Sequence, residues 1–176
     1  MTAVTPELLS RFDIPGPRYT SFPTADRFVE AFGADDYILA LEQRKAHTGA
    51  RALPLSVYVH VPFCESLCYY CACNKIVTKH HEKAAEYLDY LARELTMHTA
   101  HCGKGQVVSQ LHLGGGTPTF FSDAELQQLM ALMREHFKLD AAGEYSIEVD
   151  PRTVSNERLK VLKDMGFNRL SFGVQD

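Results

Sequence analysis

Four of the five cysteines lie within ten residues of one another, and three of them have the spacing of iron–sulfur ligands. Cys64, Cys68 and Cys71 read C-x3-C-x2-C, and Cys73 follows two positions later. Cysteine thiolates are the standard ligands of iron–sulfur clusters. Three thiolates can bind three irons of a [4Fe–4S] cubane and leave the fourth iron open to an exogenous ligand. We therefore predict a cluster held by Cys64, Cys68 and Cys71.

Two other interpretations of this loop remain open. All four cysteines could bind one structural zinc ion, or they could be buried thiols without a metal. Zinc sites usually contain two separated ligand pairs, and the sequence shows no second pair. Buried inert cysteines rarely gather on one polar loop. The cluster is therefore favoured over zinc, and iron and sulfide analysis distinguishes the two.

Two further polar features follow predicted strands. Gly114, Gly115 and Gly116 precede Thr117-Pro118, and glycines let the backbone approach a ligand closely. A plain turn would need only one or two of them. Glu148 lies on the opposite strand face from its apolar neighbours, and a carboxylate inside a barrel is costly unless it meets a ligand or a donor. Gln175, at the end of the next strand, is likewise a candidate for contact with a ligand.

Strands and helices alternate from residue 54 onward. β-Branched and aromatic residues predict strands, and apolar residues at helical spacing predict helices between them. We expect strands over 55–61, 106–113, 144–149 and 169–174. We expect helices over 80–100, from Ser122 to Phe137, and up to a stop at Gly166. This α/β order indicates a parallel sheet and about half of a (β/α) barrel, whose chemistry sits after the C-terminal strand ends.

The first 50 residues have a different pattern. Pro15, Pro17 and Pro23 interrupt the stretch from Phe12 to Thr24, which predicts an extended arm. A helix is expected over 35–47. We therefore divide the chain into an arm with a short helix, residues 1–50, and the first half of a barrel, residues 51–176. Because the sequence stops directly after a predicted strand, we expect it to be a truncated part of a longer protein.

Composition and charge exclude several classes of protein. The chain has 176 residues, of which 45% are hydrophobic and 23% charged, a balance typical of globular proteins. The formal net charge of −4 argues against non-specific nucleic-acid binding. No apolar run is long enough to cross a bilayer, and the N-terminus lacks the features of a signal peptide. We expect a cytoplasmic monomer that binds neither nucleic acid nor membrane.

The cysteine loop and the glycine loop together resemble the motifs of the radical S-adenosylmethionine (SAM) superfamily. Its members carry C-x3-C-x2-C after a first barrel strand, with an aromatic residue at the position of Tyr70. GGGTP resembles their SAM-binding glycine motif. The resemblance implies a [4Fe–4S] cluster whose open iron is chelated by SAM. It also implies that an electron from the cluster cleaves SAM to methionine and a 5′-deoxyadenosyl radical, which abstracts hydrogen from carbon.

Within that superfamily, the sequence is similar to the oxygen-independent coproporphyrinogen III oxidases. The similarity lies in the arm from Pro17 to Ala25, the additional Cys73, and the blocks LHLGGGTPTF, SIEVDPRT and FNRLSFGVQD. It implies a partial (β/α)6 barrel with a C-terminal domain beyond this sequence. It also implies oxidative decarboxylation of two propionates of coproporphyrinogen III to vinyl groups, giving protoporphyrinogen IX. An electron donor for the cluster and a terminal electron acceptor would be further partners.

The resemblance also implies two SAM molecules. The first would contact Tyr58, Gly115 and Glu148, and the second would contact Tyr70, Gly116, Thr117 and Gln175. Family members usually have Phe at the position of Tyr70 and a second Tyr at that of Phe22. A heme-binding chaperone built on the same barrel is the alternative function, although that branch generally lacks the arm motif and the fourth cysteine.

Overall fold

The computed structural model describes residues 5–13, 24–46, 53–69, 71, 73–152 and 154–173. The chain divides into two compact units, Met1–Tyr37 and Ile38–Asp176. Tyr70, Gln175 and the arm motif around Phe22 lie outside the described residues. Among the described residues of either unit, no helix is both long enough and apolar enough to cross a membrane.

The first unit contains a helix that the sequence analysis did not predict. α1 (Pro6–Phe12) begins at Thr5, whose side chain accepts a hydrogen bond from the Leu8 amide at 3.2 Å. Proline at the first helical position is favourable because its missing N–H is not needed there. A short 3-10 helix, η1 (Ala25–Arg27), follows. An N-cap and a proline thus specify a helix in a segment for which the sequence analysis predicted no element, while residues 14–23 of the expected extended stretch lie outside the described residues.

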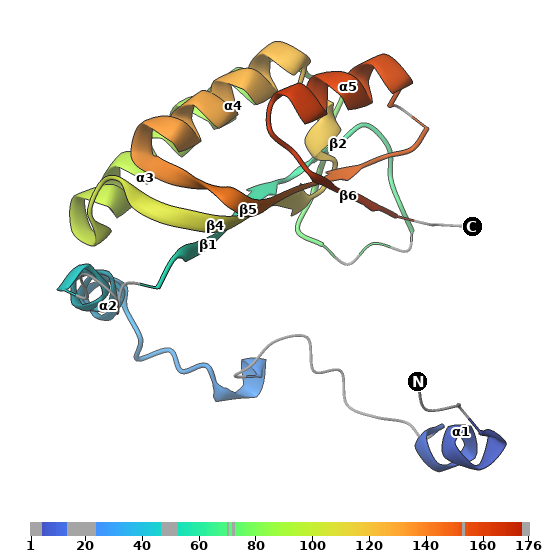
Figure 1. Ribbon diagram of the computed structural model, residues 1–176, viewed down its shortest axis with the longest axis horizontal. Helices are drawn as coiled ribbons and strands as arrows, with labels where there is room; N and C mark the ends of the chain where they lie inside the picture. The colour runs from blue at the N-terminus through green and yellow to red at the C-terminus, as the bar shows by residue number, and fades with distance from the viewer. Residues whose placement is uncertain are drawn as a thin grey trace. The chain divides into compact units, whose positions relative to one another are not determined.

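The second unit is an α/β structure with a four-stranded parallel sheet. Its order is β1-β4-β5-β6, formed by β1 (Leu55–Val61), β4 (Gln106–Gly115), β5 (Phe137–Val149) and β6 (Arg169–Phe172). The helices α3 (Lys83–Cys102), α4 (Asp123–His136) and α5 (Asn156–Asp164) connect these strands and lie on one face of the sheet (Figure 1). This confirms the predicted parallel α/β architecture. α2 (Ala34–Ala46) matches the predicted helix over 35–47.

The ends of α4 show how local sequence sets the element boundaries. Ser122, where the sequence analysis began this helix, forms a capping box with Glu125, a pattern that the sequence S-x-x-E indicates, and each side chain accepts a hydrogen bond from the backbone amide of the other. The expected helical position of Phe137 is wrong. Phe137 has extended backbone angles, φ −130° and ψ 158°, and it is the first residue of β5. Its apolar side chain is buried in either case, so helical periodicity could not separate the two states.

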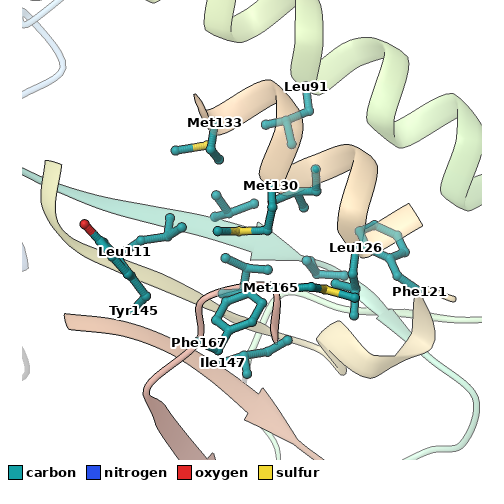
Figure 2. Packing of buried hydrophobic residues seen from close by; sticks show 14 of the residues in the cluster. Leu91, Leu111, Phe121, Leu126, Met130, Met133, Tyr145, Ile147, Met165 and Phe167 are labelled. Carbon is teal, nitrogen blue, oxygen red and sulfur yellow. The ribbon is translucent and has the colours of Figure 1, made fainter. Parts of the chain in front are cut away.

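Alternation along the strands separates an apolar face from a polar face. Residues at every second position of β1, β4 and β5 point toward the helices, and Leu111 and Ile147 are almost completely buried there. From the helices, Leu126 and Met130 of α4 pack against the same layer (Figure 2). This apolar layer is the largest favourable contribution to folding that the chain offers, and it fixes which strand residues must face the other way.

The opposite face carries two rows of polar positions in register across the strands. In one row Tyr58 is paired with His112, and His112 with Ser146. The next row contains His60, paired with Gly114, and Glu148, which follows Ile147 at the position beside Gly114. Residues brought together here are far apart in sequence, so the sheet register places them.

Replacing Leu129 with alanine should destabilise the fold strongly. Leu129 is fully buried in the apolar layer, and a buried Leu→Ala change costs roughly 2–5 kcal/mol. Leu39→Ala is the matched control, because Leu39 of α2 is 54% exposed and its truncation should change the unfolding free energy by less than about 0.5 kcal/mol. Urea unfolding monitored by circular dichroism measures both. Equal losses for the two variants would contradict the described core.

Candidate cluster and cofactor site

The cysteine loop is closed at its base by a short pair of strands. β2 (Phe63–Cys64) pairs in parallel with β3 (Ile76–Val77). The Ile76 amide donates to the Pro62 carbonyl at 2.7 Å, and the Thr78 amide donates to the Cys64 carbonyl at 2.8 Å. These bonds hold both ends of the loop together at the C-terminal end of β1. The site therefore lies where the sequence analysis placed it, beyond the end of the first barrel strand.

The three predicted ligands differ from the fourth cysteine in burial. Cys64 is buried, Cys68 and Cys71 are half-buried, and Cys73 is exposed. The Cys71 sulfur accepts a hydrogen bond from the Cys73 amide at 3.3 Å, and the Cys64 sulfur accepts one from the Thr117 hydroxyl at 3.7 Å. Cys73 thus contributes its backbone to the surroundings of a predicted ligand, and a hydrogen bond with Cys71 raises the pKa of its own thiol.

The chemistry of the cysteine loop is compatible with a cubane. A structural zinc ion requires four ligands around a single point, with zinc–sulfur distances of about 2.3 Å. In a cubane each thiolate binds a different iron, so three thiols on one loop can hold it and leave the fourth iron open.

The glycine loop is hydrogen-bonded directly to the cysteine loop. The Gly116 amide donates to the Val61 carbonyl and the Thr117 amide to the Phe63 carbonyl, each at 2.7 Å. A Cβ atom at Gly116 would lie only 2.6 Å from the Phe63 carbonyl oxygen. The close approach of two backbones therefore requires glycine at this position. A plain turn, the alternative considered above, would not by itself require a glycine at position 116.

The two preceding glycines are constrained for different reasons. Gly115 has a φ of 113°, which L-residues rarely adopt, and a Cβ there would lie 2.7 Å from the His60 ring. Gly114 has no such φ, but a Cβ would lie 2.9 Å from Nε2 of His112 and 3.1 Å from Cδ of Glu148. The run of three glycines therefore leaves room for a backbone and for polar side chains on two sides.

Glu148 lies within reach of both the glycine loop and the polar face. One of its oxygens, Oε2, accepts a hydrogen bond from the Gly115 amide at 3.1 Å. The other, Oε1, is 3.5 Å from Nε2 of His112. Burial raises the pKa of Tyr58, and the negative charges of Glu148 and Cys73 raise it further. Two predicted cofactor contacts, Tyr58 and Glu148, are thus brought to the same polar surface.

A second carboxylate ends the same strand. Asp150 follows β5 and is bound by the Arg152 guanidinium, with contacts of 2.6 to 3.2 Å. The Arg152 hydrogen bonds lower the pKa of Asp150. The Asp150 hydrogen bond and charge raise the pKa of Arg152, and the charge of the Cys68 thiolate raises it further. Asp150 and Arg152 thus form an ion pair directly beyond β5.

Comparisons with known proteins identify the family of the chain. A sequence model of the radical SAM superfamily matches residues 58–176. An oxygen-independent coproporphyrinogen III oxidase of Mannheimia haemolytica is 42% identical over 144 residues, which are 82% of this chain and 94% of the relative. The chain belongs to the radical SAM superfamily, in the oxygen-independent coproporphyrinogen III oxidase family. Superfamily members use a [4Fe–4S] cluster and SAM.

Two longer radical SAM relatives extend the comparison. The oxygen-independent coproporphyrinogen III oxidase of Pseudomonas aeruginosa is 49% identical over 97% of this chain, which corresponds to 36% of the relative. The solved structure of coproporphyrinogen III oxidase from Escherichia coli, described as a radical SAM enzyme, matches with a TM-score of 0.79 and 50% identity. That match covers 90% of this chain and 35% of the other. The chain thus spans about a third of the length of these relatives.

The structure adds residues that the motif analysis missed. His112 and Ser146 were not selected, yet they lie beside Tyr58 and Glu148 on the polar face. The available signal was strand alternation, because Leu111 and Leu113 on either side of His112 are buried toward the helices. His60 lies on the same face, where its ring nitrogens are 3.0 Å from the Tyr58 hydroxyl and 2.8 Å from the Asn74 carbonyl.

Replacing Gly116 with alanine should impair cluster assembly. The new methyl group would clash with the Phe63 carbonyl, which is backbone and next to Cys64, so the cysteine loop must shift. We expect a several-fold loss of bound iron and sulfide after anaerobic reconstitution of the full-length protein. Gly33→Ala is the control, because its Cβ would meet nothing closer than Asp36 at 4.0 Å. Full iron content in Gly116→Ala would show that this close approach is dispensable.

Proposed function

We propose that the full-length protein is a radical SAM enzyme that decarboxylates two propionates of coproporphyrinogen III to vinyl groups, giving protoporphyrinogen IX. The observation that carries the proposal is the cysteine loop bonded to the glycine loop, combined with identity of 42–49% to relatives named for this activity. The alternative, a heme chaperone on the same barrel, is not favoured, because the names of these relatives refer to the oxidase.

In this proposal Cys64, Cys68 and Cys71 hold the [4Fe–4S] cluster. Three observations support this ligand assignment: the spacing of the three cysteines, their greater burial relative to Cys73, and their position on one closed loop. The cluster and SAM supply the radical chemistry when bound. The protein residues fix the cluster next to the glycine loop and exclude water from the Cys64 side, where Phe63 and Phe120 pack with ring centroids 5.1 Å apart.

The SAM contacts are assigned to two molecules. Tyr58, Gly115 and Glu148 would bind the first SAM. Each oxygen of Glu148 already accepts one hydrogen bond from the protein, and a carboxylate has about four acceptor positions. Two positions therefore stay available for the amine or ribose hydroxyls of SAM. Glu148 supports the proposal because its carboxylate is held in one orientation before any ligand is present.

The second SAM would contact Tyr70, Gly116, Thr117 and Gln175. Gly116 and Thr117 lie against the cysteine loop, where their amides bond to its backbone. The aromatic ring of Tyr70 offers a stacking surface, and Gln175 follows the last strand. The substrate, the electron donor for the cluster and the terminal electron acceptor complete the set of partners that this function requires.

Substitution of single cysteines tests the ligand assignment. Cys64→Ala, Cys68→Ala and Cys71→Ala should each abolish the cluster, because each removes one of three thiolate ligands. Cys73→Ser is the matched control from the same loop and should keep about four irons per chain. Iron and sulfide analysis and the EPR spectrum of the reduced protein measure the outcome. Loss of metal in Cys73→Ser would favour a four-thiolate zinc site and reject the assignment.

Turnover by the full-length protein tests the activity. Purified anaerobically and supplied with SAM and a reductant, it should convert coproporphyrinogen III to protoporphyrinogen IX, detected as fluorescent porphyrin after oxidation. The Cys68→Ala variant should show no conversion. Tight heme binding by a protein that holds both cluster and SAM, without conversion, would instead support the chaperone.

A further inference from the structure

His112 connects the two polar rows of the sheet. It is paired across the strands with Ser146, and its Nδ1 atom is 2.6 Å from the Ser146 hydroxyl. On its other side, Nε2 is 3.5 Å from Oε1 of Glu148, which lies one step further along β5 on the same face. Such diagonal neighbours in a sheet are within reach of long side chains. The imidazole therefore bridges a hydroxyl and the carboxylate assigned to SAM.

These contacts determine where the imidazole proton lies. The Ser146 hydroxyl can donate to Nδ1 at 2.6 Å or to the Leu111 carbonyl at 3.4 Å. If it donates at the shorter distance, Nδ1 is the acceptor and the neutral ring carries its proton on Nε2. If Nδ1 alone carried the proton, an unprotonated Nε2 would face the carboxylate, and two acceptors would repel. The favourable arrangement therefore directs an Nε2–H toward Glu148.

The surroundings keep the ring in this orientation. The Tyr58 ring stacks on His112 with a centroid distance of 5.8 Å and an interplanar angle of 19°. Gly114 leaves the space through which His112 reaches Glu148, because a Cβ there would lie 2.9 Å from Nε2. The acceptor is held in place as well, because the Gly115 amide donates a hydrogen bond to the other oxygen of Glu148. The orientation of the imidazole and the position of its acceptor are thus both fixed by neighbouring residues.

We propose that His112 is a positioning residue for SAM, acting through Glu148. This inference rests on the proposed function. Ser146 sets the tautomer of His112, the Nε2–H of His112 orients one carboxylate oxygen of Glu148, and the Gly115 amide orients the other. The remaining lone pairs of Glu148 are then held in a fixed orientation and accept hydrogen bonds from SAM without rearrangement. Groups that orient ligand-binding residues in this way typically change affinity by about 10–100-fold when removed.

Two substitutions of His112 separate the effect of losing its hydrogen-bond donor from the effect of changing the size of the side chain. Gln places an amide N–H near the position of Nε2, whereas the shorter Asn side chain places its amide near Nδ1 and does not reach Glu148. In the anaerobically reconstituted full-length protein, His112→Asn should raise the SAM concentration for half-saturation about tenfold. His112→Gln should stay within about threefold of wild type. Equilibrium dialysis with labelled SAM measures binding directly, independent of turnover.

Ser146→Ala provides a second measurement that leaves the imidazole in place. Without the hydroxyl the tautomer is no longer set, and we expect a rise of about threefold in the half-saturating SAM concentration, smaller than the roughly 10–100-fold range for such groups because the imidazole stays in place. His98→Asn is the control, since His98 lies on α3 and pairs with Glu94 at 3.6 Å. It should bind SAM as wild type does. Iron content and unfolding midpoint are measured for every variant.

The outcomes distinguish this inference from the proposed function. Wild-type SAM affinity in His112→Asn, or equal loss in His112→Asn and His112→Gln, overturns the positioning role and leaves the function intact. If His112→Asn does not fold, unchanged affinity in Ser146→Ala overturns it instead. A wild-type protein that holds its cluster but binds no SAM rejects both. A loss of affinity in His112→Asn that Gln restores, at constant iron content, supports the inference.

Discussion

Two backbone hydrogen bonds between the glycine loop and the cysteine loop hold the candidate site together. They run from the amides of Gly116 and Thr117 to the carbonyls of Val61 and Phe63. Each joins the end of β4 to the segment that carries Cys64, so main-chain bonds link a predicted cluster ligand to the assigned SAM contacts. Because these bonds use main-chain atoms, they constrain side chains only through the space they leave, and that space excludes any Cβ at Gly116.

The sheet provides the rigid support for this junction. Its apolar face is buried under α3, α4 and α5, and the alternation of strand residues then forces polar side chains onto the other face. Parallel strands place their C-terminal ends at one edge. The end of β1 leads into the cysteine loop, the end of β4 into the glycine loop, and the end of β5 into Asp150 and Arg152. Packing on one face thus determines the chemistry available on the other.

Local sequence was sufficient to predict features that depend on spacing or alternation. The four strands of the parallel sheet, the capping box of α4 and the position of the cysteine loop belong to this group, although β5 begins at Phe137 rather than at residue 144 and the short β2 and β3 were not predicted. The helix over 6–12 was missed, although Thr5 followed by Pro6 is a helix start. Phe137 was misplaced because a buried aromatic residue satisfies both helical and strand periodicity. The roles assigned to Tyr70 and Gln175 concern positions outside the described part of the chain and stay predictions.

Contacts that depend on register between distant strands could not be predicted in this way. His112 and Glu148 are 36 residues apart, and a shift of β5 by one residue would turn Glu148 toward the helices. What fixes the register is the burial of Leu111, Leu113, Tyr145 and Ile147 on the opposite face. The polar network is therefore specified indirectly, by residues whose side chains lie on the other face of the sheet.

The composition of the polar face follows from the same constraint. An imidazole, a hydroxyl and a carboxylate on one surface are costly where water is excluded, unless each finds a partner. Here His112 satisfies Ser146 and one oxygen of Glu148, and the Gly115 amide satisfies the other. A glycine at position 114 is what makes this possible, because any larger residue would occupy the space between the imidazole and the carboxylate. The glycine run therefore serves two neighbours at once: Gly116 admits the backbone of the cysteine loop, and Gly114 admits the side-chain network that orients Glu148.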